Sequence, residues 1–358
     1  MLGTLAAVLA FQGRIADAAD LVEQAKSSSP AYRDSILVEI ECCVAWLAGD
    51  TARALASALE EASWTRVTSR RRSFGMTVGA IAAVEADDVL VAKRLLDRAH
   101  AALGGRDWSF FLQYAHYAES VIAWHEGSPA ECVARLRPAI ERMLEMEVRP
   151  WAAFALMDLA EAAADAGDTA AASGAADHLG ALAVVMDVPL YRGLAAAGSA
   201  WEHLARGEGE HGAALARQAI GSLQSTGCRG YEARARYLLA RCLSTSQRTE
   251  AVRELEQAAA AFDRGGGVWR RERALEALRR LGNAGRRAAA AALGPSSLTR
   301  REREVARLAA RGMSAKQISQ TLFIGERTVE THLANVYAKL GVKSKLQLVR
   351  QAAELGLA

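Results

Sequence analysis

The sequence predicts an all-α protein in which a helical-repeat superhelix is followed by a small four-helix domain. Apolar residues make up 51% of the 358 residues and there are only 6 prolines, which suits a helix-rich chain with a large core. Apolar positions recur at helical spacing, and the sequence contains almost no alternating runs of the kind that indicate strands. Helix-stop signals also return at a nearly constant interval along most of the chain.

The repeats are marked by residues that favour tight turns between helices. Helical periodicity is interrupted, at steps of 36, 38, 40, 40 and 40 residues, at Gly13, Gly49, Asp87, Gly127, Gly167 and Gly207. A seventh hinge is expected near Ser246. A fixed period of this size predicts stacked helix pairs, each burying its apolar face against its neighbours. The units resemble tetratricopeptide repeats, although they exceed the usual period of about 34 residues.

The end of the array is marked by a helix that lacks a partner. Apolar spacing predicts this helix over Trp269–Leu281, where we expect it to cap the array. After it, the sequence NAGRRAAAAALGPSS contains a Gly-Pro pair that must break any helix. We therefore predict a repeat domain over residues 1–283, a linker over 284–297 and a second domain over 298–358.

The C-terminal segment carries start and stop signals for four short helices. Three hydroxyl residues stand three positions before a Glu or Gln, the spacing of a capping box: Thr299 with Glu302, Ser314 with Gln317, and Ser344 with Gln347. The apolar runs stop at Gly312, Gly341 and Gly356. Only Phe323, Ile324 and Gly325 separate the second and third helices, so the two must cross steeply, as in a helix-turn-helix.

Charge is concentrated in this segment. Residues 298–358 hold 11 Lys and Arg against 5 Asp and Glu, a net charge of +6, whereas the whole chain carries +3. The first 297 residues are therefore acidic on balance. A basic domain with a helix-turn-helix pattern is typical of proteins that bind DNA.

The outward face of the third helix supplies candidate contacts to DNA. Residues near the start of a recognition helix meet base edges, and we assign this role to Glu330, Thr331, Ala334 and Asn335. A glutamate can accept from a cytosine amino group, and a threonine offers both a hydroxyl and a methyl group. We expect phosphate contacts from Lys316, Arg327, Thr328, Lys343 and Lys345.

At these residues the segment resembles the DNA-binding domain of the LuxR family of transcriptional regulators. The matching words are LTRREREV, GMSAKQIS, GERTVETHLANVYAKLGV and KSK. The resemblance implies double-stranded DNA as a ligand and a homodimer on that DNA, paired through the fourth helix, here Lys345–Leu355. It also implies RNA polymerase as a partner. Many relatives carry a basic residue at the position of Glu330, so the family's base preference does not transfer to this chain.

The layout of the whole chain resembles the MalT-like regulators, which are large ATP-binding members of the LuxR family. In those proteins the repeats receive an inducer or a protein partner, and we expect the concave face of this array to bind one or the other. The ATPase module is missing here, because no G-x-x-x-x-G-K-[ST] motif occurs, and we predict no cofactor. Met1 already lies in a helical pattern, so we expect a shortened relative or the C-terminal part of a longer one.

One aromatic stripe is a candidate ligand or partner site within the repeats. It consists of Trp108, Phe110, Tyr114, Tyr117 and Trp124, and ordinary core packing is the alternative interpretation of the same helical spacing. Arg70–Arg72 fit a solvated helix start better than a phosphate site. A Gly run at 265–267 fits a turn better than a nucleotide loop.

Enzyme motifs are missing, among them G-x-S-x-G and H-E-x-x-H, so we predict that the chain is not an enzyme. The five cysteines are scattered and suit a reducing cytoplasm, with a redox sensor as the alternative. No apolar run is long enough to span a membrane, so a cytoplasmic location is expected. The second functional hypothesis is a scaffold for protein partners with only a weakly specific DNA-binding module.

Overall fold

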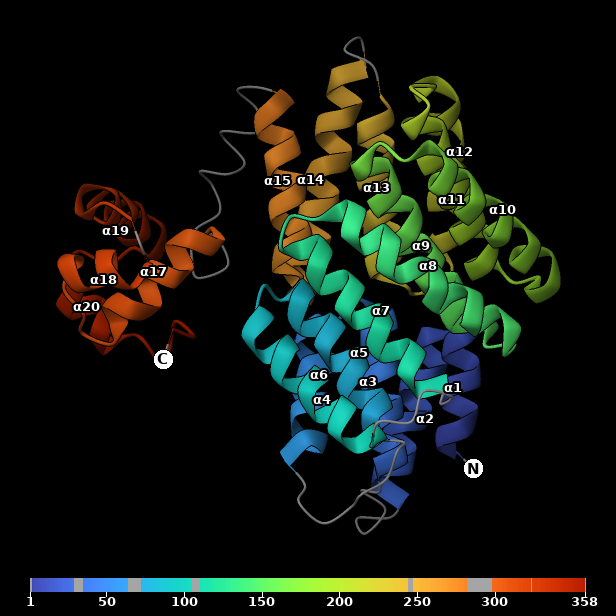
Figure 1. Cartoon of the computed structure of the whole chain (residues 1–358), viewed down its shortest axis with the longest axis horizontal. Coiled ribbons are helices and arrows are strands. Elements are labelled where there is room, and N and C mark those ends of the chain that lie inside the picture. The colour runs from blue at the N-terminus through green and yellow to red at the C-terminus, as the bar shows by residue number, and fades with distance from the viewer. Residues whose placement is uncertain are drawn as a thin grey trace. The chain divides into compact units, whose positions relative to one another are not determined.

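The computed structural model describes residues 2–28, 35–63, 72–104, 110–243, 247–281, 298–322 and 324–357. These ranges are helical and contain no strand, as predicted (Figure 1). The chain divides into two compact units, Met1–Ala274 and Leu275–Ala358. The helix that joins them, α15, begins in the first unit and ends in the second.

The first unit consists of seven helix pairs and the start of α15. The pairs are α1 (Leu2–Phe11) and α2 (Ile15–Ser28), α3 (Ser35–Ala48) and α4 (Thr51–Ser63), α5 (Arg72–Glu85) and α6 (Val89–Leu103), α7 (Phe110–His125) and α8 (Pro129–Glu145), α9 (Arg149–Ala166) and α10 (Thr169–Met186), α11 (Pro189–Ala205) and α12 (Gly209–Gln224), and α13 (Arg229–Cys242) and α14 (Arg248–Gly265). The last helix, α15, spans Val268–Leu281.

The predicted hinges are confirmed as the turns within successive pairs. All six have the positive φ that reverses a chain after a helix, including Asp87 at φ 65°. The predicted seventh hinge, at Ser246, lies outside the described residues. The helices of these pairs are 10 to 18 residues long.

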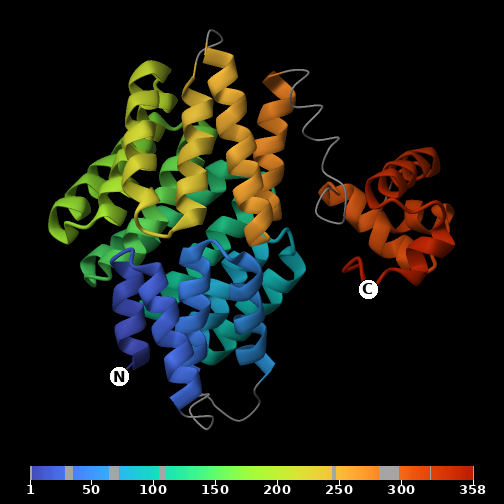
Figure 2. The same cartoon turned by 180° about the vertical axis from the view of Figure 1, so that it is seen from behind.

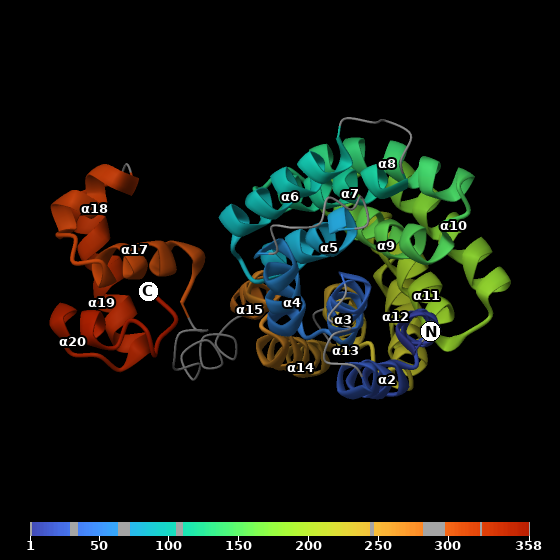
Figure 3. The ribbon, with the colours of Figure 1, turned by 90° about the horizontal axis from the view of Figure 1, so that it is seen from below.

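The array curves until its last pair meets its second pair. The first helices of successive pairs pack against one another in order, and α13 then contacts α3 (Figure 3). From behind, the blue N-terminal helices lie directly against the yellow helices near the end of the array (Figure 2). Glycines make this contact close: a Cβ on Gly49 would lie 2.6 Å from the backbone nitrogen of Gly230. A Cβ on Gly265 would collide with the Gly49 carbonyl oxygen.

Aromatic side chains gather around α9 on the inner side of the array, the side on which we expect an inducer or partner to bind. Trp46 of α3 stacks on Trp151 of α9, with ring centroids 5.6 Å apart, and meets the edge of Phe154 at 5.5 Å. Phe154 also contacts Tyr231 of α13 at 5.4 Å. Every residue of α9 from Trp151 to Ala163 is buried, because the surrounding helices cover it on all sides. In the part of the array that the structure describes, the space around α9 is therefore occupied by packed side chains.

The second unit holds the four C-terminal helices: α17 (Arg300–Ala310), α18 (Ala315–Leu322), α19 (Glu326–Leu340) and α20 (Lys345–Arg350). Their core contains fully buried Val305, Ile318, Val329, Val336 and Leu348. The fourth helix is shorter than expected. It ends at Arg350, and turns rather than a regular helix continue toward the predicted end at Leu355.

Candidate nucleic-acid interface

Hydrogen bonds at the helix starts fix the orientation of the C-terminal helices. The backbone N–H of Thr299 donates to the Glu302 carboxylate at 2.9 Å, and the N–H of Glu302 donates to the Thr299 hydroxyl at 3.3 Å. Ser314 and Gln317 form the same reciprocal pair at 2.8 and 3.3 Å. Both predicted capping boxes are thus confirmed, and each satisfies backbone donors that a helix start leaves free.

The third predicted box forms only in part. The N–H of Gln347 donates to the Ser344 hydroxyl at 3.3 Å, as predicted. The Gln347 side chain, however, accepts from the N–H of Lys343 at 2.9 Å rather than from Ser344. The result is a tight loop before α20 that holds Lys343 at the surface.

Glu302 also links the first helix of this unit to α19. The Lys339 ammonium lies 2.6 Å from the Glu302 carboxylate, which is almost fully buried. Burial raises the pKa of Glu302, but the hydrogen bonds from Lys339 and the Thr299 backbone outweigh it, so the pKa lies below its ordinary value. The Glu302 carboxylate therefore stays ionised at neutral pH, and its contact with Lys339 fixes α19 against α17.

The turn between α18 and α19 is held from the outside by an arginine. The Arg301 guanidinium donates to the carbonyl oxygen of Leu322 at 2.7 Å, at the last residue of α18. Gly325 is the N-cap of α19, with φ −64° and no side-chain cap bond. The first backbone N–H groups of α19 therefore have no side-chain acceptor at this cap, and phosphate oxygens commonly fill that role.

One face of α19 is buried and the other carries the predicted base-contacting residues. Val329 and Val336 are fully buried in the core of the unit. On the opposite face, at helical spacing, the following residues are exposed: Arg327, Glu330, Thr331, Ala334 and Asn335. The fold thus gathers them on one surface, as the sequence predicted.

The residues predicted to contact phosphates differ in exposure and in whether their side chains already form hydrogen bonds. Lys316, Thr328 and Lys343 are exposed. Lys345 is half-buried, and its ammonium donates to the carbonyl oxygen of Gly312 at 2.7 Å, so it caps the end of α17. The Thr331 hydroxyl donates to the Arg327 carbonyl at 3.0 Å and keeps its lone pairs for accepting.

The predicted aromatic stripe of the array is mostly core. Tyr114, Tyr117 and Trp124 are buried, whereas Phe110 is 42% exposed. Trp108 lies outside the described residues, as do Arg70 and Arg71. The Tyr117 hydroxyl donates to the Asp158 carboxylate at 2.5 Å, which gives this residue a structural partner.

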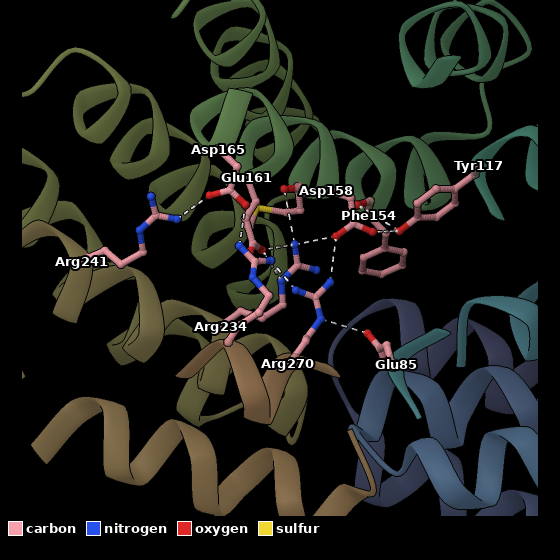
Figure 4. A network of polar contacts seen from close by, with 11 residues as sticks. Glu85, Tyr117, Phe154, Asp158, Glu161, Asp165, Arg234, Arg241 and Arg270 are labelled. Atoms are coloured by element: carbon pink, nitrogen blue, oxygen red, sulfur yellow. Dashed lines mark hydrogen bonds and ion pairs between the residues drawn. The ribbon is translucent and has the colours of Figure 1, made fainter. Parts of the chain in front are cut away.

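The Asp158 contact belongs to a buried ionic network that sequence reasoning missed (Figure 4). Asp158 and Glu161, both 1% exposed, come from α9 and pair with arginines of α13 and α15. Burial raises the pKa of Glu161, but Arg273, Arg234 and Arg270 outweigh it and lower the value to about 2. The available signal was the occurrence of Asp158 and Glu161, three positions apart, within the apolar stretch Trp151–Ala163.

Neither a membrane-spanning helix nor a metal site is found in the part of the chain that the structure describes. No helix there combines the length and apolar character that crossing a bilayer requires. No group of three or more His, Cys, Asp or Glu side chains there is arranged to hold a metal ion. All five cysteines are free thiols and buried.

Comparisons with known proteins identify the C-terminal segment. The family model described as bacterial regulatory proteins, luxR family, matches residues 296–352. An HTH-type transcriptional regulator of Mycobacterium tuberculosis is 54% identical over 65 residues, which is 18% of this chain and 7% of that protein. The spore germination protein GerE of Bacillus subtilis is 44% identical over 59 residues, 16% of this chain and 80% of GerE. The oxygen regulatory protein NreC of Staphylococcus aureus is 44% identical over 55 residues, 15% of this chain and 25% of NreC. The chain thus aligns with only a small part of the mycobacterial relatives.

Proposed function

The chain belongs to the luxR family of bacterial regulatory proteins, and we propose that it regulates transcription by reading a DNA sequence with α19 under the control of the helical array. The observation that carries this proposal is the exposed polar face of α19. It lies opposite a buried apolar face, in a domain of net charge +6. DNA recognition by a helix needs this division, because one face must hold the helix while the other enters the major groove. A bacterial regulator that binds chromosomal DNA acts in the cytoplasm.

The side chains on α19 divide into two roles. Glu330, Thr331, Ala334 and Asn335 would meet base edges, where direct readout depends on hydrogen bonds and methyl contacts. Arg327, Thr328, Lys316 and Lys343 would meet phosphates, which set affinity and register but carry no sequence information. Lys345 is expected to contribute less to phosphate binding, because its ammonium already donates to the Gly312 carbonyl oxygen.

Pairing of two chains on DNA would use α20. Leu346 and Val349 on this helix are 62% and 38% exposed, so an apolar surface is available for a second copy. Two domains paired in this way would bind half-sites separated by about one helical turn, roughly 10 base pairs.

The array is proposed to receive the signal, as a small-molecule inducer or a protein partner. Its interior is filled, so this signal would act on the outer surface or on the balance between closed and open forms. The alternative function is a scaffold for partner proteins, which the large helical surface of the array also suits. That alternative predicts DNA binding that is weak and insensitive to sequence.

Selection from random duplex DNA with the full chain tests the proposal. We expect one enriched motif with two related half-sites. Lys343→Ala should weaken binding to every sequence and reduce the slope of log affinity against log salt by about 1, whereas Glu330→Ala should relax preference at one base pair by about 1–3 kcal/mol. Lys93→Ala removes the same charge from an exposed site on α6 and serves as the control. Equal losses on all sequences for both interface variants would leave the scaffold function as the better explanation.

A further inference from the structure

The first two turns of α15 insert arginines into the array. Arg270 is 5% exposed, and its guanidinium contacts Glu85 of α5 at 3.2 Å, Asp158 at 3.2 Å and Glu161 at 3.3 Å. Arg273 contacts Glu161 at 2.7 Å. These acids precede α15 by more than 100 positions in the sequence, so α15 is fastened to the middle of the array rather than only to the pair before it.

Aromatic rings of α7 and α15 lie beside the arginines that form these ion pairs. The edge of Trp269 meets the Trp124 ring of α7, with centroids 5.1 Å apart. The guanidinium of Arg273 lies 4.8 Å from the Trp124 centroid, and that of Arg270 lies 5.1 Å from the Trp269 centroid. These cation–π contacts add to the ion pairs that hold α15 on the array.

The acids of α9 have a second set of arginines that does not come from α15. Arg234 of α13 contacts Asp158 at 2.6 Å and Glu161 at 2.8 Å. Arg241 of α13 contacts Asp165 at 2.6 Å, the acid that also accepts from Arg273 (Figure 4). If α15 leaves, each acid of α9 therefore keeps a charged partner. A buried charge without a partner would be prohibitively costly, and this duplication avoids it.

The contact between Arg270 of α15 and Glu85 of α5 lies beside a small cavity. Glu85, Arg234, Arg270 and Tyr231 are among the residues that line a space of about 30 Å³, which is enough for a water molecule. The Tyr231 hydroxyl is buried there without a hydrogen-bond partner in the structure. Water in this space can hydrate Glu85 as Arg270 withdraws, so departure of α15 leaves no stranded charge on α5 either.

We propose that α15 is a detachable element whose docking on α5, α7 and α9 restrains the DNA-reading domain that follows it. This inference rests on the proposed function. Two chains must place their recognition helices about 34–36 Å apart on DNA while each carries a bulky array. Release of the 14-residue α15 lengthens the connection by about 20 Å if the helix persists, which makes joint engagement of two half-sites easier. A signal that displaces α15 would then raise affinity for the paired site.

The test compares two double variants of the full chain that remove the same charge from the same helix. Arg270→Gln with Arg273→Gln weakens docking, whereas Arg279→Gln with Arg280→Gln changes two arginines that form ion pairs with Glu276 on α15 itself. Hydrogen exchange should become at least tenfold faster in α15 of the first variant, with α9 unchanged. The same variant should bind paired half-sites at least fivefold more tightly and a single half-site with unchanged affinity. The control should behave as the native chain does in both measurements.

Each contrary result has a distinct meaning. Equal acceleration of exchange in α9 and α15 would show that α15 is an inseparable part of the array core, and would overturn the inference. Faster exchange in α15 with unchanged or weaker binding to paired half-sites would overturn the coupling. Absence of selective DNA binding in the native chain and in both variants would instead defeat the proposed function, which the exchange experiment does not depend on.

Discussion

Closure of the array depends on a backbone contact that a single methyl group should disrupt. Gly49 ends α3 at φ 76°, and a Cβ there would lie 2.6 Å from the nitrogen of Gly230. In Gly49→Ala, the left-handed conformation costs about 1–2 kcal/mol. The forced separation of α3 from α13 adds about 1–3 kcal/mol, as overpacking does in cores.

Gly167→Ala is the control that separates the overpacking cost from the conformational cost. Gly167 has nearly the same conformation, φ 73°, but a Cβ there would meet nothing within 4 Å. Both variants bear the conformational strain, and only Gly49→Ala also opens the contact with Gly230. At roughly 2–4 °C per kcal/mol for a unit of this size, Gly49→Ala should melt about 2–12 °C below Gly167→Ala.

Thermal unfolding followed by circular dichroism measures this difference directly, and exchange of the α13 amides locates it. We expect faster exchange at the start of α13 in Gly49→Ala only. Equal melting temperatures for the two variants would refute the inference that α3 and α13 are held together by this close approach. The aromatic contacts and the ion pairs between α9 and α13 would then have to hold the array closed.

Two further predictions follow from the burial of titratable groups. The five cysteines of the native chain should resist iodoacetamide at near-neutral pH until urea is added, because the thiols are buried and burial raises the pKa of Cys43 to about 12. Mass spectrometry checks this, and modification without urea would support redox sensing instead. Burial raises the pKa of Glu302, but hydrogen bonds from Lys339 and the Thr299 backbone lower it below the ordinary 4.5, so the carboxylate stabilises the C-terminal unit at neutral pH. That contribution should be lost as the pH falls from about 4.5 through the folded pKa. Hydrogen exchange in residues 298–322 should thus be faster in Glu302→Gln than in the native chain at neutral pH, and this difference should shrink as the pH falls below 4.5. A difference that grows toward low pH would contradict this.

The features that the sequence predicted correctly are those specified by a few neighbouring residues. A turn that needs positive φ selects glycine or an acid, so residues such as Gly49 and Asp87 marked the positions of the turns in the sequence. A capping box is complete within four residues, so Thr299 and Glu302 predicted the start of α17. The outward face of α19 followed from helical spacing alone.

The features that the sequence did not reveal depend on partners far along the chain. The spacing of Trp46 and Trp151 is compatible with packing inside any helix pair, and only the curvature of the array brings them together. Lys345 resembles a phosphate contact until the fold places the Gly312 carbonyl 2.7 Å from its ammonium. The acids of α9 that pair with Arg270 and Arg273 of α15 lie more than 100 positions earlier in the chain, so no pattern within α15 identified these partners.

Closure of the array and docking of α15 are linked, because Arg234 and Arg270 meet the same acids of α9 from two different helices. A ligand cannot enter the interior without separating Trp46 from Trp151, and the contact of Gly49 with Gly230 opposes that separation. Under the proposed function, a signal received by the array would have two routes to the DNA-binding domain. It can open the array and loosen α13 and α15 together, or it can displace α15 from an array that stays closed. Exchange in Gly49→Ala distinguishes the routes: faster exchange in α15 as well as α13 means that closure controls docking, whereas an unchanged α15 means that it detaches independently.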